Sequence, residues 1–448
     1  MTSELPPSPE EAFVWIWLPG MVEPVVAGRI SRERSVYAFN YGRSYLERKD
    51  ASGPVIGGVN PPAGATASLN ALPIFLPELP LVRGALLPEA PLTMAGCLRD
   101  GAPDAWGRRV IIHRLTGLRG RAVRDVEFDE LTYLLHSGSD RAGALDFQGS
   151  ATTYLPRRAD DATLEELAHA AGRVERGEPI PDSLERALFH GTSIGGARPK
   201  AVIDDGPRKL IAKFSASSDT HSVVKAEYVA MRLAARVGIQ VAPVELAQAG
   251  GKDVLLVERF DRASTPSGWC RRMMVSALTL FGLDEMQARY ASYADLAEMI
   301  RARFTEPQAT LRELYARLVF NVLVGNTDDH ARNHAAFWDG AQLTLTPAYD
   351  ICPQSRSGRE SNQAMLIDGA DRSSRLEICR LSANRYLLSD MEAKEIIDGQ
   401  VQAIIDAWRE VCDQAQLSEV DRAFLWRRQF LNDFAFEGYA GARPTGLD

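Results

Sequence analysis

The chain has 448 residues, 45% hydrophobic and 25% charged, a composition typical of a globular protein with room for two or three packed units. Its net charge of −8 and its pI near 5.6 exclude a protein whose main task is to neutralise nucleic-acid phosphates, so any DNA contact should come through a partner. The five cysteines form no C-x-x-C pair, which argues against a disulfide framework or a structural zinc site.

The N-terminal segment "MTSELPPSPEEAFVWIWLPG" lacks the features of a signal peptide. It is acidic where a signal peptide is basic, and Pro19 and Gly20 interrupt its apolar run. No stretch of the sequence approaches the about 20 apolar residues needed to span a bilayer. These features predict a cytoplasmic protein without membrane contact.

The first third of the chain predicts an α+β subdomain over residues 10–150. Short apolar runs broken by Gly and Pro predict a small sheet from about Phe13 to Gly42. The segment "RDGAPDAWGRRVIIHRLTG" predicts a helix with Pro103 in its first turn and Gly117 at its end. A helical connector with the charges of a surface helix is expected over residues 151–190.

Residues 191–263 predict a strand-rich unit. "GTSIGGARPKAVIDDGPRKLIAKF" indicates a Gly-rich loop followed by two strands, and "VELAQAGGKDVLLVERFDR" indicates a hairpin. The helix "SVVKAEYVAMRLAARVG" lies between them. From residue 264 to 440 the pattern is helical. The predicted fold class is α+β, two-lobed and protein-kinase-like, with a strand-rich N-terminal lobe, an added N-terminal subdomain and an all-helical C-terminal lobe.

Directly after an apolar helix, the segment "NTDDHARNHAAFWDGAQLTLTPAYDICP" concentrates polar side chains. Asp328 and Asn333 have the separation of the catalytic Asp and the metal-binding Asn in the kinase pattern H-R-D-x-x-x-x-N (333 − 328 = 5). A hairpin turning at Asp339-Gly340 would bring Asp350 back beside Asn333. Because Mg²⁺ prefers carboxylate and amide oxygens with phosphate oxygens and water, we expect Asn333 and Asp350 to bind Mg²⁺ and Asp328 to act as the base.

The strand-rich unit supplies candidate ATP contacts. The glycines of "SIGGARPK" let backbone N–H groups approach phosphate oxygens, with Arg198 and Lys200 nearby. Lys213 is placed like the strand lysine of a kinase, and Glu227 on the next helix could pair with it, although a surface helix charge is the simpler interpretation. The strand "VLLVERF" would end in a hinge. Its backbone groups are expected to contact adenine: Glu258, Arg259 and Phe260.

Several of these segments carry a family resemblance. "SIGGARPKA", "VERFDR", "NTDDHARNHA" and "PAYDICP" resemble signature segments of the HipA-type serine/threonine kinases, the toxins of bacterial toxin–antitoxin pairs. "DGAPDAWGRR" and "GSDRAGAL" are similar to segments of that family's N-terminal subdomain. The resemblance implies ATP and Mg²⁺ as cofactors, a HipB-like helix-turn-helix antitoxin as partner and DNA contact only through that antitoxin. It also implies a cytosolic protein substrate, with aminoacyl-tRNA synthetases as the candidate class.

The resemblance assigns roles by position. Asp328 matches the catalytic base, Asn333 and Asp350 match the magnesium ligands, and Ser193 matches the autophosphorylated serine, with Thr192 as an alternative acceptor. The matched ATP contacts are Gly195, Gly196, Ala197, Arg198, Pro199, Lys200, Lys213, Glu258, Arg259, Phe260, His330, Asn333, Tyr349 and Asp350. Two positions depart from the family's best-known form: Arg198 replaces Gln, and Asp329 replaces Gly. No role follows for Asp329.

Two rival functions remain open at this point. A metal-dependent phosphoesterase would use Asp328, Asp329, His330 and His334, but two-metal hydrolases need several convergent ligands, and the chain has only 7 histidines. A catalytically weak nucleotide-binding protein could instead act only as a co-repressor with an antitoxin. The intact set of Asp328, Asn333 and Asp350 counts against this second alternative.

Overall fold

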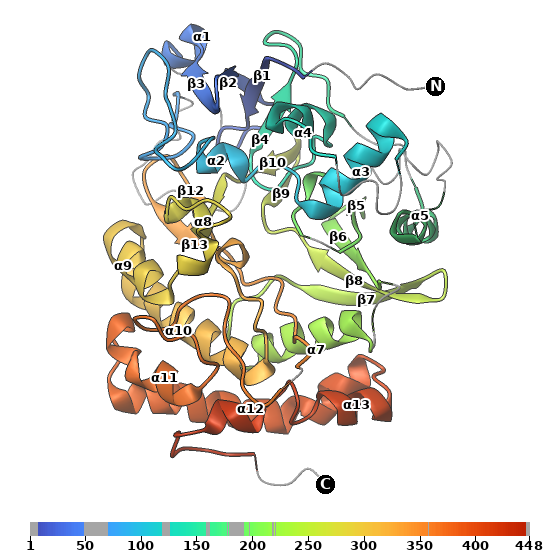
Figure 1. Cartoon of the computed structure of the whole chain (residues 1–448), viewed down its shortest axis with the longest axis vertical. Helices are drawn as coiled ribbons and strands as arrows, with labels where there is room; N and C mark the ends of the chain where they lie inside the picture. The colour runs from blue at the N-terminus through green and yellow to red at the C-terminus, as the bar shows by residue number, and fades with distance from the viewer. Residues whose placement is uncertain are drawn as a thin grey trace. The chain divides into compact units, whose positions relative to one another are not determined.

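The computed structural model describes residues 8–48, 70–118, 126–157, 162–176, 178, 192–196, 198–216, 219, 221–356 and 358–444 (Figure 1). The chain divides into two units. The first unit comprises Met1–Ser218, Gln248–Val275 and Phe337–Ala341; the second comprises Asp219–Ala247, Ser276–Ala336 and Gln342–Asp448. Each unit is therefore assembled from segments that are distant in sequence. Ala197 and residues 179–190 of the expected connector lie outside the described residues.

The expected small sheet of the first unit is present and has one strand more than the sequence indicated. It is antiparallel, with the order β3-β2-β1-β4, so β4 joins from more than 100 residues downstream. Its strands are β1 (Glu11–Ile16), β2 (Val25–Glu33), β3 (Val36–Tyr41) and β4 (Leu145–Gln148). The helices of this part are α1 (Arg43–Leu46), α2 (Gly96–Arg99), α3 (Ala105–Thr116), α4 (Glu130–His136) and α5 (Leu164–Arg176). As expected, α3 ends at Gly117, which has a left-handed φ of 68°.

A second four-stranded sheet has the order β5-β6-β8-β7. Its strands are β5 (Lys200–Asp204), β6 (Lys209–Phe214), β7 (Val244–Ala249) and β8 (Lys252–Glu258). β5 and β6 form the expected hairpin, with Lys200 directly opposite Lys213. A short ribbon of β9 (Arg262–Thr265) and β10 (Gly268–Arg271) follows.

A buried network of charges links "GSDRAGAL" to "VERFDR" within the first unit. The Asp261 carboxylate accepts hydrogen bonds from Arg259 and Arg262 at 2.8 Å each, and from the Gly143 N–H at 2.8 Å. Asp140 accepts from the same two guanidinium groups, at 3.1 and 2.7 Å. The side chains of Arg259 and Arg262 are only 1% and 2% exposed. Because a buried charge is costly unless it is paired, each of the two segments stabilises the other.

The network continues through Arg141, whose side chain is fully buried. Arg141 pairs with Asp146 at 2.9 Å and also donates to the carbonyl oxygens of Gly101 and Leu134. Arg157 reaches the same Asp146 carboxylate at 2.9 Å. These bonds join the turn after α2 to α4 and β4.

Replacing Asp261 by Asn is expected to lower the free energy of unfolding by about 3–5 kcal/mol, because Arg259 and Arg262 stay buried after losing a carboxylate. The loss should be measured by chemical denaturation. As a control, Glu11→Gln removes one partner of an exposed pair with Arg29 and should cost less than about 1 kcal/mol. A loss for Asp261→Asn no larger than that of the control would contradict this account of the network.

The pH dependence of this loss gives a second check. Burial alone would raise the pKa of Asp261, but Arg259 and Arg262 outweigh it and hold the pKa at about 2, below the ordinary 3.8. A carboxylate with a depressed folded pKa adds stability above its unfolded pKa and loses it as the pH falls through the folded value. The stability gap between wild type and Asp261→Asn should therefore be full at pH 7 and shrink from about pH 3.8 down to about 2.

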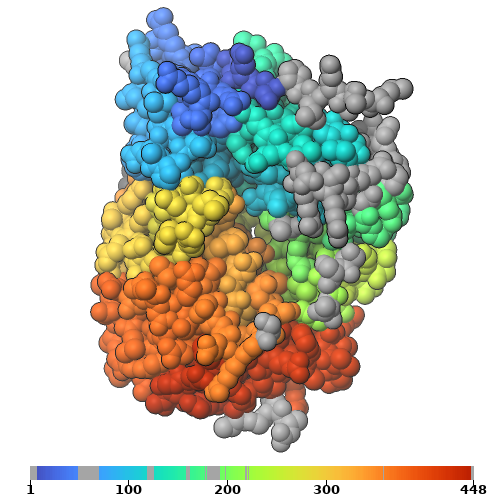
Figure 2. Space-filling model, viewed as in Figure 1, coloured from blue at the N-terminus to red at the C-terminus, as the bar shows by residue number. Residues whose placement is uncertain are grey.

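The second unit is mainly helical. In it α12 lies beside α7, and the orange and red C-terminal helices form one continuous surface (Figures 1 and 2). α12 begins at a capping box formed by Ser389 and Glu392. The helices are α7 (Val223–Arg236), α8 (Ala277–Leu280), η3 (Ala288–Tyr290), α9 (Tyr293–Arg303), α10 (Pro307–Val324), η4 (Ala331–Asn333), α11 (Leu376–Leu381), η5 (Ala383–Tyr386), α12 (Asp390–Gln414), α13 (Glu419–Leu425) and η6 (Asp433–Phe436).

The C-terminal half differs from the all-helical expectation by a small sheet. Its strands, in the order β11-β12-β13, are β11 (Met274–Ser276), β12 (Ala335–Trp338) and β13 (Leu343–Leu345). β12 and β13 are the hairpin that the sequence predicted after Asn333, whereas β11 had no clear signal because it is only three residues long. Within the described part of the chain, no helix combines the length and the apolar character needed to cross a membrane.

Candidate functional site

The polar segment after α10 begins at a tightly constrained glycine. Gly325 ends the helix with a left-handed φ of 69°, and a Cβ at this position would lie 2.8 Å from the carbonyl oxygen of Gln429. The preceding residues 318–324 are buried. The helix is therefore anchored in the core, and residues 326–334, here called the catalytic loop, leave it in a defined direction.

The catalytic loop brings Asp328 and Asn333 together. The His330 N–H donates to the Asp328 carbonyl oxygen at 2.8 Å, and the Asn333 N–H donates to the His330 carbonyl oxygen at 2.8 Å. The Asn333 side-chain amide also donates to the Asp328 carbonyl oxygen, at 3.2 Å. Because its nitrogen is used in this bond, the amide presents its Oδ1 as the atom for a cation, which fits a magnesium ligand.

Asp350 returns to the same region after the β12–β13 hairpin. Its backbone is left-handed, with φ of 59°, a conformation that non-glycine residues adopt mainly where the surroundings require it. Burial raises the pKa of the Asp328 carboxyl, His330 opposes the rise, and the Asp350 carboxylate adds to it. The two carboxylates are thus close enough to repel each other, and a divalent cation would relieve that repulsion.

Two further predicted ATP contacts lie at the catalytic loop. The Nδ1 atom of His330 is buried and has no hydrogen-bond partner among the described residues, so this ring nitrogen can bond to a ligand or water. The Tyr349 hydroxyl donates to the Arg332 carbonyl oxygen at 2.7 Å, which holds the loop beside Asp350.

Asp329, to which the sequence assigned no role, is buried and 3% exposed. Its Oδ2 accepts hydrogen bonds from the Tyr293 hydroxyl and from His334 Nε2, the latter at 3.0 Å. His334 is also 3% exposed. Asp329 and His334 therefore bind each other in the core and do not converge on a metal with Asp328.

In the part of the chain that the structure describes, no cluster of three or more His, Cys, Asp or Glu side chains is arranged to hold a metal ion. The residue set required for a two-metal phosphoesterase is accordingly not assembled there.

The predicted phosphate loop lies in the first unit and packs on the start of α3. The Gly196 N–H donates to Asp104 Oδ2 at 2.5 Å, and the Trp106 N–H donates to the Gly196 carbonyl oxygen at 3.4 Å. Ser193 is 3% exposed and Thr192 is fully buried. Sequence reasoning missed Asp104, although "DGAPDAWGRR" had been singled out; the available signal was the Asp that directly precedes a helix.

Two lysines extend from the phosphate loop into the sheet. Lys200 and Lys213 are directly opposite each other in the β5–β6 pair, so their side chains leave the same face of the sheet. The Lys200 ammonium donates to the Gly195 carbonyl oxygen, and the Phe214 N–H donates to the Pro199 carbonyl oxygen at 3.1 Å. The face that carries both ammonium groups thus lies next to the glycine pair. Arg198 is half-buried in the same segment.

Arg259 of the predicted hinge already uses its N–H group and its side chain in bonds within the fold. The Arg259 N–H donates to the Lys209 carbonyl oxygen at 2.8 Å, and the Arg259 side chain belongs to the buried charge network. An adenine contact from Arg259 would therefore have to use its carbonyl oxygen. Glu258 and Phe260 are half-buried on either side of it. Glu227, which the sequence suggested as a surface charge, is 4% exposed, so that interpretation was wrong.

Replacing Gly107 by Ala is expected to displace the phosphate loop. A Cβ at Gly107 would lie 2.2 Å from the Thr192 carbonyl oxygen and 2.9 Å from the Pro103 Cβ, so residues 192–196 would have to move away from α3. Hydrogen exchange of the amides in residues 192–196 should then be faster than in wild type. Gly149→Ala is the control, because no atom lies within 4 Å of a Cβ built there. Equal protection in both variants would show that this packing does not hold the loop.

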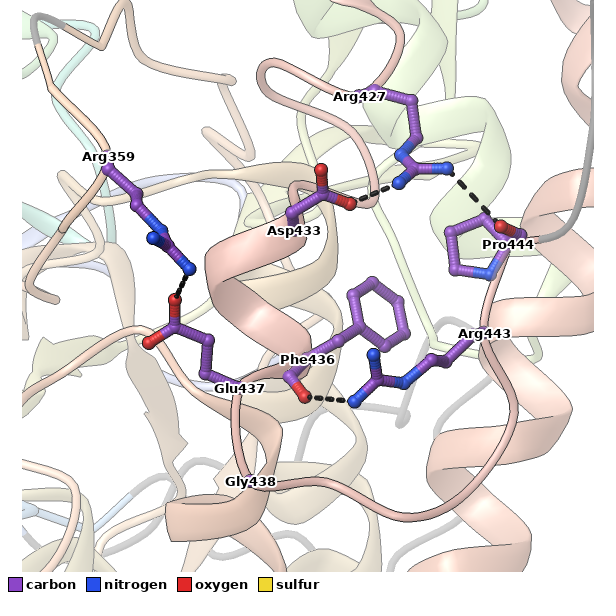
Figure 3. A pocket seen from close by; sticks show the side chains of 8 residues that line it. All are labelled: Arg359, Arg427, Asp433, Phe436, Glu437, Gly438, Arg443 and Pro444. Carbon is purple, nitrogen blue, oxygen red and sulfur yellow. Dashed lines mark hydrogen bonds and ion pairs between the residues drawn. The ribbon is translucent and has the colours of Figure 1, made fainter.

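A pocket of about 410 Å³ in the second unit is separate from these residues (Figure 3). Arg359 pairs with Glu437 and Arg427 pairs with Asp433, while Arg443 donates to the Phe436 carbonyl oxygen. Its lining contains none of the predicted nucleotide or metal contacts. Figure 3 shows two ion pairs, Arg359 with Glu437 and Arg427 with Asp433, while Arg443 bonds to a backbone carbonyl oxygen.

Comparisons with known proteins agree with this architecture. Residues 192–408 match the family model described as "HipA-like C-terminal domain". The chain is 20% identical to HipA in the solved complex of HipA, HipB and operator DNA from Shewanella oneidensis MR-1. That match has a TM-score of 0.65 and covers 92% of this chain and 93% of that one. The likeness shows the fold, and the predicted two-lobed, kinase-like α+β class is confirmed.

Two curated proteins are similar over part of the chain. "Putative kinase Y4mE" of Sinorhizobium fredii is 30% identical over 176 residues, 36% of this chain and 41% of that protein. "Serine/threonine-protein kinase toxin HipA" of Shewanella oneidensis is 26% identical over 201 residues, 39% of this chain and 46% of that protein. The matches therefore span less than half the length of these relatives. The fold is therefore kinase-like. The HipA-like match of residues 192–408 agrees with the resemblance seen in the sequence.

Proposed function

We propose that this protein is an ATP-dependent serine/threonine protein kinase of the HipA type, acting as the toxin of a toxin–antitoxin pair. The observation that carries the proposal is that the Asn333 amide bonds to the Asp328 carbonyl oxygen and that the Asp350 carboxylate, which follows the β12–β13 hairpin, acts on the Asp328 carboxyl. These three residue types at this spacing are the ones expected for phosphoryl transfer. Relatives named as kinases support the same activity.

In this proposal Asp328 accepts the proton of the substrate hydroxyl as that oxygen attacks the γ-phosphate of ATP. Its raised pKa suits a base that must take up a proton. Asn333 Oδ1 and the Asp350 carboxylate would hold Mg²⁺, which neutralises phosphate charge when bound. Gly195, Gly196, Arg198, Lys200 and Lys213 would contact the phosphates, with the remaining predicted contacts on the base and ribose.

The partner and substrate belong to the same proposal. The relative of known structure was solved as HipA with HipB and operator DNA, which supports a HipB-like antitoxin as partner here and DNA contact through it. The acidic net charge of −8 fits a protein that reaches DNA indirectly. The substrate would be a cytoplasmic protein, with aminoacyl-tRNA synthetases as the candidate class. Co-repression without catalysis is the second candidate, and the transfer assay below separates the two.

Autophosphorylation at Ser193, or at Thr192 beside it, is part of the proposal. Both side chains are buried in the present conformation, and the Thr192 hydroxyl accepts a hydrogen bond from the Gly138 N–H at 3.1 Å. Residues 192–196 must therefore leave this packing before either hydroxyl can react. A phosphate at this position would carry about −1.5 to −2 charges and could not return beside the Asp104 carboxylate. Modification should hold the phosphate loop out and switch the kinase off.

Replacing Asp328 by Asn should abolish phosphoryl transfer while leaving Mg²⁺-ATP binding largely intact, because the base is lost and the metal ligands stay. Replacing Asp350 by Asn should weaken Mg²⁺-ATP binding itself. A transfer assay with labelled ATP and calorimetric titration measure the two effects. Asp406→Asn, on the exposed side of α12, is the control. Transfer at the wild-type rate by Asp328→Asn would refute the catalytic assignment. A wild-type protein that binds ATP without transfer would favour the co-repressor.

Incubation of the wild-type protein with Mg²⁺-ATP is expected to add one phosphate at Ser193 or Thr192, and peptide mapping identifies which hydroxyl reacts. The Asp328→Asn variant serves as the inactive control and should stay unmodified. Ser193→Asp should lower ATP affinity, because its carboxylate repels the nucleotide phosphates. If Ser193→Asp bound ATP and phosphorylated substrate as well as wild type, inhibition through this loop would be disproved.

A further inference from the structure

The catalytic loop is fastened to the core by a continuous chain of buried side-chain hydrogen bonds. Asn326 Nδ2 donates to Asn321 Oδ1 at 3.0 Å, and Asn321 Nδ2 donates to the Tyr293 hydroxyl at 3.3 Å. The Tyr293 hydroxyl donates to Asp329 Oδ2, to which His334 Nε2 also bonds at 3.0 Å. None of the five side chains is more than 3% exposed. The chain begins at the first residue of the loop and ends at the last.

The donors in this chain all point toward the Asp329 carboxylate. A carboxylate only accepts, so the His334 bond requires the imidazole proton on Nε2. The Tyr293 hydroxyl donates to Asp329 and can therefore accept from Asn321. A buried carboxylate is tolerated only when donors surround it, and a hydrogen-bonded network of this kind restricts the motion of the groups that it joins. Asn326 Oδ1 and His334 Nδ1 are the atoms of this chain of hydrogen bonds that have no partner among the described residues. Asp329 is thus held in one place by Tyr293 of α9 and by His334, and Asn321 of α10 supports Tyr293.

The two ends of the Asp329–His334 bond are the residues that follow Asp328 and Asn333. The side-chain bond therefore closes the loop immediately beyond the proposed base and the proposed magnesium ligand. Three hydrogen bonds connect Asp328 to Asn333 inside the loop. Two are backbone bonds, donated by the His330 and Asn333 N–H groups, and the third is donated by the Asn333 side chain to the Asp328 carbonyl oxygen. A short loop with so few internal bonds depends on external anchors to keep its reactive atoms in place.

We propose that Tyr293, Asp329 and His334 are positioning residues for phosphoryl transfer. They act through Asp328 and Asn333 and touch no substrate. This inference rests on the proposed kinase function. It assigns a role to Asp329, which the family resemblance left without one, and it explains why that carboxylate lies beside the core.

The test compares turnover with stability in matched variants. Tyr293→Phe removes one hydroxyl, and His334→Leu removes the second donor to Asp329. Each should lower kcat on the order of 10²-fold, the loss expected when reacting groups shift by about 1 Å, while the KM for ATP stays within about threefold. His334→Gln keeps a side-chain N–H donor and should recover most of the kcat that His334→Leu loses.

Gln400→Leu provides the control for a purely structural effect. Gln400 on α12 is 4% exposed, and its Nε2 donates to the Ala316 carbonyl oxygen at 2.9 Å, so the variant also removes a buried hydrogen bond of the second unit. It should lower the free energy of unfolding without lowering kcat. If Tyr293→Phe kept the wild-type kcat, or if kcat fell with stability in Gln400→Leu as well, the positioning role would be overturned.

Hydrogen exchange measured without nucleotide tests this inference independently of the proposed function, because it does not depend on phosphoryl transfer. In Tyr293→Phe the amides of residues 328–334 should exchange faster than in wild type, and in Gln400→Leu they should not. If the wild-type protein had no transferase activity, the kinase proposal would be wrong, but the exchange of these amides could still be measured and compared. Unchanged exchange in Tyr293→Phe would defeat the positioning role whether or not the protein is a kinase.

Discussion

The pairing of Arg259 and Arg262 with Asp140 and Asp261 is the constraint on which the first unit depends. Arg259, Arg262 and Asp261 are nearly inaccessible to solvent and Asp140 is partly buried, so these charges cannot remain apart without a large desolvation cost. Their pairing fixes the end of β8 against the segment that precedes β4. Within the predicted hinge, Arg259 is consequently part of the core, because both its side chain and its N–H group are bonded there.

At the other motifs, too, residues of one segment hold another segment in place. "DGAPDAWGRR" supplies Asp104, Trp106 and Gly107 to the phosphate loop, as "GSDRAGAL" supplies Asp140 and Gly143 to "VERFDR". In the catalytic loop, Asn326, Asp329 and His334 face the core, whereas Asp328 and Asn333 carry the proposed chemistry. This division offers a reason for the concentration of polar residues after α10, since three of them bond within the core and others are free to carry the proposed chemistry.

Local patterns were sufficient for much of this structure. The helix ending at Gly117, the β5–β6 hairpin and the β12–β13 hairpin follow from Gly placement and short-range periodicity. The spacing of Asp328 and Asn333 identified the candidate site. Contacts between distant segments could not be predicted in this way: the partners Tyr293 and Asp329 are 36 residues apart, and Asp104 and Gly196 are 92 apart. Such pairings depend on tertiary packing, which leaves no short-range signal in one sequence.

The buried arginines also bear on where the chain can be divided. The segment recognised as HipA-like begins at residue 192, yet two of its guanidinium groups find carboxylate and carbonyl partners at residues 140–143. A fragment that began at residue 192 would lack these partners. The two guanidinium groups would then be exposed to solvent or buried with fewer hydrogen-bond partners. The boundary drawn from sequence similarity, at residue 192, therefore does not coincide with the boundary of the buried charge network, which includes residues 140–143.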